Sequence, residues 1–151
     1  MSGVFDYSNL AKLLIDCLEK NLKLPMIESN STGPQPDAPF VTYTVTSPYI
    51  AITSDVIEKE VFECVLSLTI HHSSKLAALS LSERLRKLFH QKGIRLDFST
   101  KDVVIVSTTR TQSRDNFISY DYERLAGFDL RLRVKDSFVD DTIETIENIE
   151  I

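Results

Sequence analysis

A strict alternation of residues constrains the fold of this chain more than any other feature. Apolar side chains occupy every second position of one segment, at Phe62, Cys64, Leu66, Leu68 and Ile70. Successive side chains of a β-strand point to opposite faces of the sheet, so a period of two predicts a strand with one buried face. A second alternation, from Phe128 to Lys135, places charged residues between the apolar ones. Both patterns predict half-buried strands of a sheet that covers a core.

Two helices are predicted from apolar residues at helical spacing, the first over residues 6–23 and the second in the middle of the chain. Short polar side chains favour helix starts, and proline or glycine favours helix ends. For the first helix, Asp6 or Ser8 is expected at the start and Pro25 at the end. For the second helix, Ser73 or Ser74 is expected at the start, His90 at the end and Gly93 as the C-cap.

Two more strands follow from runs of β-branched and aromatic residues. The first is expected from Phe40 to Thr46, ended by Ser47-Pro48, with a connection from Tyr49 to Glu58. The second is expected within 102–109, where the run Val103–Val106 predicts a strand that is covered on both faces or lies centrally.

The resulting order is α-β-β-α-β-β, followed by a C-terminal segment that resembles a strand. We therefore predict an α+β fold, with a single mostly antiparallel sheet and two helices packed on one face. A length of 151 residues suits one domain spanning 1–151. The β-branched residues of 142–151 favour a strand, although Ile143, Ile146 and Ile149 lie three apart.

Two segments are expected to be irregular. All five prolines lie between positions 25 and 48, and residues 26–38 form a Pro-rich loop that either contacts a partner or is an inert surface loop. The polar residues 111–116 are expected to form a turn or an extended arm.

The acidic residues are concentrated at the C-terminal end. The extension 136–151 has six acidic residues and no Lys or Arg, so the net charge of −5 leaves residues 1–135 with about +1. A general basic field for nucleic acid is therefore not expected. The first six residues lack the basic and apolar regions of a signal peptide, and we expect no membrane partner and folding in the cytoplasm.

No pattern typical of catalysis, of a cofactor site or of a metal site was found. The four glycines are far apart, and His71 and His72 would point to opposite faces of a strand. Cys17 and Cys64 lie in apolar patterns and are expected to be buried and unreactive. We therefore predict no catalytic residues, no metal and no cofactor.

The arginines on the last strand have two interpretations. Arg131 and Arg133 share its polar face, where cross-strand acids such as Glu63 would screen them. Alternatively, they receive the acidic terminus of a neighbouring copy, because Arg–carboxylate pairs are directional and would fix a subunit's register.

Three passages together resemble the neck and tail terminator proteins of tailed bacteriophages. They are Pro39–Tyr43, Tyr122–Val134 and Thr142–Ile151, and the order of elements also matches that family. The resemblance implies a structural virion protein at the tail–neck junction, assembled in the bacterial cytoplasm. Such a subunit would belong to a ring, expected to be a hexamer, that caps the tail tube and meets the head connector. Its expected partners are copies of itself, the tail tube protein, the head-completion or connector protein and, in a contractile tail, the sheath protein, with DNA only passing through the lumen.

The candidate sites that follow from the charge pattern and this resemblance are surfaces for assembly. The candidate subunit-interface residues are Arg124, Arg131, Arg133, Asp140, Asp141, Glu144, Glu147 and Glu150. The candidate axial-contact residues are Gly33, Pro34, Pro36, Arg114, Asp115 and Asn116. Other functions left open are another head–tail joining protein of the neck, a small α+β domain that binds a ligand or nucleic acid, and, least favoured, an enzyme.

Overall fold

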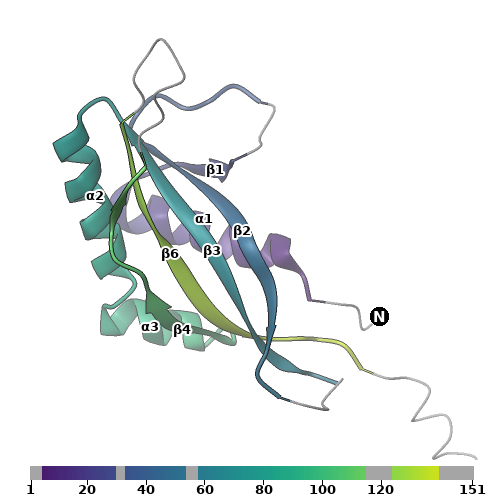
Figure 1. Ribbon diagram of the computed structural model, residues 1–151. Coiled ribbons are helices and arrows are strands. Elements are labelled where there is room, and N and C mark those ends of the chain that lie inside the picture. The colour runs from purple at the N-terminus through teal and green to yellow at the C-terminus, as the bar shows by residue number, and fades with distance from the viewer. Residues whose placement is uncertain (1–4, 30–32, 54–57, 115–123, 140–151) are drawn as a thin grey trace, which may run out of the picture.

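The computed structural model describes residues 5–29, 33–53, 58–114 and 124–139. Three helices and six strands are assigned in these residues (Figure 1). The helices are α1 (Tyr7–Leu22), α2 (Lys75–Leu88) and α3 (Lys92–Ser99). The strands are β1 (Met26–Glu28), β2 (Phe40–Ala51), β3 (Val61–His72), β4 (Val103–Thr108), β5 (Gln112–Ser113) and β6 (Arg124–Lys135).

The six strands form one sheet in the order β1-β2-β3-β6-β4, and β5 pairs with β6. All pairings are antiparallel except that of β1 with β2. The β3–β6 pairing is uninterrupted, from Val61 opposite Lys135 to His72 opposite Arg124. The two alternating segments of the sequence therefore lie next to each other, with their apolar residues on one face.

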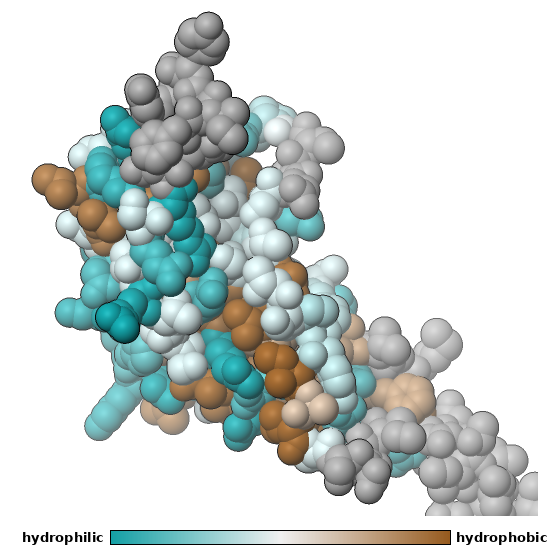
Figure 2. All heavy atoms as spheres, in the orientation of Figure 1, coloured by the Kyte–Doolittle hydropathy of each residue, from teal (hydrophilic) through white to brown (hydrophobic). Residues whose placement is uncertain are grey.

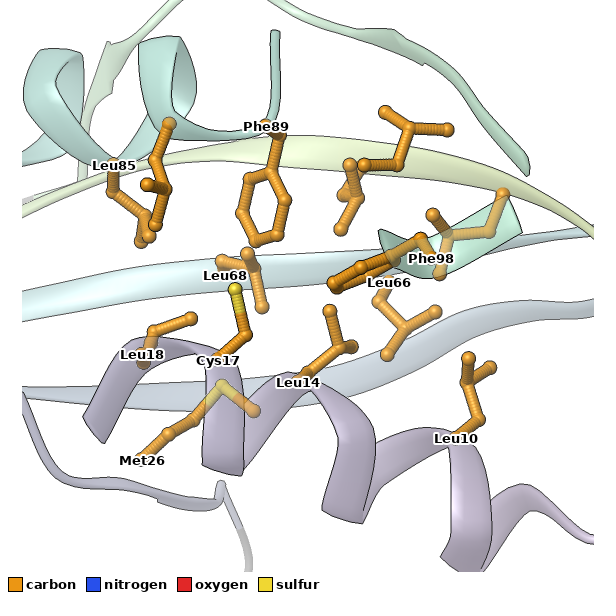
Figure 3. Packing of buried hydrophobic residues seen from close by; sticks show 14 of the residues in the cluster. Leu10, Leu14, Cys17, Leu18, Met26, Leu66, Leu68, Leu85, Phe89 and Phe98 are labelled. Carbon is orange, nitrogen blue, oxygen red and sulfur yellow. The ribbon is translucent and has the colours of Figure 1, made fainter. Parts of the chain in front are cut away.

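The hydrophobic core lies between that face and the helices. Leu14 and Leu18 of α1, Leu85 of α2 and Phe98 of α3 are completely buried against the strands (Figure 3). Figure 1 shows all three helices on the same side of the sheet. The predicted α+β class with a mostly antiparallel sheet is thus confirmed, and the second sheet face carries no helix among the described residues.

The predicted caps of the first two helices are present. The Asp6 carboxylate accepts a hydrogen bond from the Ser8 amide, and the Ser74 hydroxyl accepts one from the Ala77 amide. The prediction that Gly93 caps α2 was wrong, because Gly93 is the second residue of α3. Ile94 and Phe98 pack one side of this short helix onto the core, which gives the chain a third helix.

The observed strands differ from the predicted ones in two further respects. β2 continues through Ser47 and Pro48 to Ala51, with register shifts along its pairing with β3. This edge tolerates proline because β1 pairs only with Val41–Tyr43, so the rest of β2 has no strand on its outer side among the described residues. The Pro-rich segment begins with the short strand β1 rather than a loop.

β4 is neither central nor covered on both faces. It pairs with β6 on one side and is the last strand of the described sheet on the other. Val104 is 45% exposed, whereas Val103 and Ile105 point into the core. The apolar run that predicted a doubly covered strand therefore marks an exposed apolar edge.

Candidate assembly surface

The sheet face opposite the helices is open. Thr42 and Thr44 of β2, Ser67 of β3 and Arg131 of β6 belong to the strand positions that alternate with the core residues. Figure 2 views the molecule from this side, where pale and teal residues are mixed and hydrophobic ones gather in the lower part. A broad, mixed surface of this kind suits contacts with another macromolecule better than enclosure of a small molecule.

One carboxylate holds two arginines on the open face. Glu63 Oε1 accepts from Arg131 Nε at 2.5 Å, and Glu63 Oε2 accepts from Nη2 and Nε of Arg133 at 2.8 and 3.1 Å. The Glu63 side chain is 5% exposed, against 40% and 45% for Arg131 and Arg133. The structure thus shows that Glu63 screens the charges of Arg131 and Arg133. Because two guanidiniums share one carboxylate, a net charge of one positive unit is left at the surface.

Replacing Glu63 by glutamine is expected to lower the free energy of unfolding by about 2 kcal/mol, because a buried amide would face two guanidiniums without a compensating charge. Urea denaturation at neutral pH measures this loss. Glu83→Gln is the control: Glu83 also binds an arginine, Arg86 at 2.7 Å, but its side chain is 44% exposed. The control should lose less, and equal losses would show that burial of Glu63 is not what matters.

The stability of the Glu63→Gln variant is also expected to depend on pH differently from that of the wild-type chain. Hydrogen bonds from Arg133 and then Arg131 outweigh the effect of burial and hold the pKa of Glu63 below its ordinary 4.5. The resulting stability is complete above 4.5 and is lost as the pH falls through the lowered pKa. Glu63→Gln should therefore flatten the acid limb of the stability curve, and an unchanged limb contradicts the assignment.

Arg114, the residue that follows β5, is bound to the open face. Its Nη1 donates to Ser67 Oγ at 2.6 Å and to Thr69 Oγ1 at 3.0 Å, and its Nη2 lies 3.2 Å from Asp129 Oδ1. Gly127 of β6 makes room for this contact, because a Cβ atom there would lie 3.0 Å from Arg114 Nη1. Arg114 thus joins β3 to β6 and has a structural role in the isolated chain.

A shallow groove lies between α3 and the outer edge of β4. Its lining consists of Lys92, Arg95, Leu96, Ser99, Val104 and Ile105. Leu96 is 66% exposed, and with Val104 it gives the groove an apolar floor. Arg95 donates from Nη2 to the Ile105 carbonyl at 3.1 Å and so covers one carbonyl beside β4. Sequence reasoning missed this groove because Gly93 was interpreted as the end of a helix.

The predicted interface residues are only partly brought together. Arg131 and Arg133 share the Glu63 site, and Arg124 lies at the other end of β6, opposite His72. The acids Asp140, Asp141, Glu144, Glu147 and Glu150 lie outside the described residues, as does the predicted strand 142–151.

The predicted axial-contact residues are also separated. Gly33 and Pro34 are exposed and Pro36 is half-buried, whereas Arg114 is engaged with the sheet. Asp115 and Asn116 lie outside the described part of the chain.

The residues with reactive side chains are held in structural roles. Cys17 and Cys64 are buried, and burial raises the pKa of the Cys64 thiol to about 11. His71 stacks on Phe40 with ring centroids 4.4 Å apart, and its Nε2 lies 3.0 Å from Thr42 Oγ1. Within the described ranges no group of His, Cys, Asp and Glu is suited to hold a metal ion, and no helix is long and apolar enough to cross a membrane.

Comparison with known proteins gave one informative result. The family model described as phage neck terminator protein matches residues 8–151, which is nearly the whole chain and includes every strand of the sheet. A search of curated proteins found no match.

Proposed function

We propose, from the premise that the chain belongs to the phage neck terminator protein family, that its copies form a ring closing the end of the tail tube. Members of this family are structural proteins of the phage neck, and a neck protein belongs to the virion and contacts other head and tail proteins. The ring, its expected hexameric number and the capping of the tube are our proposal. The family match across 8–151 is the observation that carries it.

The architecture supports assembly from identical copies. A closed ring needs two different complementary patches on each subunit, which meet head to tail. This chain offers an open sheet face and an apolar sheet edge, and its C-terminal segment is acidic. Hydrophobic contact and opposite charge can then act in the same interface, and charge sets its register.

We further propose that the ring faces the tail tube on one side and the head connector on the other, with sheath as a third neighbour in a contractile tail. Gly33 and Pro34 are the described exposed residues that we assign to such axial contacts. DNA would pass through the lumen without specific recognition. The two arginines at Glu63 are consistent with a lack of specific DNA recognition, because Glu63 already neutralises part of their positive charge.

A phage whose gene for this chain is deleted tests the proposal. Electron microscopy of its lysate should show tubes that exceed the normal tail length, and heads that are not joined to tails. Supplying the wild-type chain from a plasmid should restore normal length and joining. Tails of normal length without attached heads would overturn the capping role and indicate a joining protein elsewhere in the neck.

A further inference from the structure

The groove between α3 and β4 has a composition that selects a particular kind of partner. Its floor is the exposed pair Leu96 and Val104, and its α3 rim carries the cations Lys92 and Arg95. Neither cation forms an ion pair with the described residues. Arg133, the cross-strand neighbour of Val104, lies on the other side, where it shares the single carboxylate of Glu63 with Arg131. An apolar strip between cations fits an extended segment that carries both aliphatic and acidic residues.

The C-terminal end of this chain is a segment of that kind. Residues 142–151 read Thr-Ile-Glu-Thr-Ile-Glu-Asn-Ile-Glu-Ile, with four isoleucines, three glutamates and no Lys or Arg. We propose that this segment of one copy lies in the α3–β4 groove of a neighbouring copy. Its isoleucines cover Leu96 and Val104, and its glutamates meet Lys92, Arg95 and Arg133. The inference rests on the proposed ring, for which it supplies the two complementary patches.

The direction in which the chain leaves the sheet favours a neighbouring copy over the same copy. After β6, the Asp136 amide donates to the Glu60 carbonyl at 2.7 Å, and the Lys59 amide donates to the Phe138 carbonyl at 2.9 Å. The chain therefore turns toward the start of β3, on the side of β6 away from β4. The twelve residues 140–151 span at most roughly 40 Å when extended, which is enough to reach an adjacent subunit.

The opposite edge of the sheet is less suited to this segment. β1 ends in the acidic residue Glu28, and the hydroxyl of Tyr49 on β2 binds the carboxylate of Glu60. An acidic strand placed there would meet like charges. Charge therefore assigns the segment to the β4 edge.

Cysteine cross-linking in the full-length chain tests the placement. Tagged chains carrying Leu96→Cys are co-expressed with untagged chains carrying Ile149→Cys, and oxidised after assembly in solution or on tails. A disulfide between tagged and untagged chains is expected. The matched control replaces Leu76, an exposed leucine of α2 that is 76% accessible, and should give little cross-linking. The wild-type chain controls for the buried Cys17 and Cys64.

A charge exchange tests the chemistry independently. The double variant Lys92→Glu, Arg95→Glu should weaken self-association about tenfold or more, and reversing Glu144, Glu147 and Glu150 to lysine in the same chain should restore much of it. If the chains self-associate but form no cross-link, and neither the lysine and arginine substitutions nor the glutamate substitutions change the affinity, the groove assignment is overturned. The proposed ring would then still stand. A cross-link only within one chain, or to a different neck protein, would also overturn it. Absence of any self-association of the wild-type chain, on tails as well as in solution, would instead refute the proposed ring.

Discussion

Gly127→Ala is expected to lower the free energy of unfolding by at least about 3 kcal/mol, although it adds one methyl group. Gly127 lies on β6 opposite Thr69 of β3. An added Cβ would lie 2.1 Å from the Leu68 carbonyl oxygen and 3.0 Å from the Thr69 Cα, and these atoms belong to the backbone. A rotamer change cannot remove such a clash, so the two central strands would have to separate.

Urea and thermal denaturation measure this effect, and the midpoint of thermal unfolding should fall by roughly 10 °C. Gly93→Ala is the matched control, because nothing lies within 4 Å of a Cβ placed at that helical position. Alanine there should stabilise the chain by up to about 1 kcal/mol, since glycine is unfavourable in helices. The steric argument fails if both variants shift the free energy in the same direction.

Phe89→Ala is expected to cost about 3–5 kcal/mol, the range for deleting a large buried ring. Phe89 follows α2 and is completely buried. Its ring centroid lies 6.2 Å from that of Phe98 in α3 and 6.4 Å from that of Phe128 in β6, with edge-to-face geometry. This one side chain therefore joins two helices to the sheet.

Denaturation of Phe89→Ala and Phe89→Leu separates the cavity from the loss of aromatic contacts, and leucine should recover part of the free energy. Because Phe89 packs on Phe98, the alanine variant should also increase hydrogen exchange in α3 more than in α1. Uniform changes in both helices would contradict the local role of this ring.

The sequence patterns predicted most of the architecture correctly because they reflect strong local requirements. A half-buried strand needs alternation, and both alternating segments became the long paired strands β3 and β6. The capping residues Asp6 and Ser74 were each predicted as one of two alternatives, because free amides at a helix start need an acceptor. Burial of Cys17 and Cys64 followed from the apolar patterns around them.

The features that were not predicted depend on contacts between distant segments. α3 is only eight residues long, and it is held by Phe98 against Phe89 rather than by a long apolar stripe. The run Val103–Val106 is apolar throughout, and such a run is compatible with a strand that is covered on one face or on both. The sequence of this run therefore did not indicate that β4 lies at the edge of the described sheet. The candidate site was likewise predicted only in part. Glu63 was named as a screen for Arg131 and Arg133, but the groove required α3 and β4 to meet.

The anchoring of Arg114 has a consequence for the segment 115–123. The Arg114 amide donates to the Leu125 carbonyl at 2.8 Å, and Ser113 pairs with Ala126, so both ends of that segment start from adjacent, fixed points of the sheet. The entropy of closing a loop changes only slowly with its length once its ends are fixed together. The segment can thus be shortened, lengthened or rewritten with little effect on folding. Replacing these nine residues is therefore expected to change the proposed axial contact without unfolding the subunit.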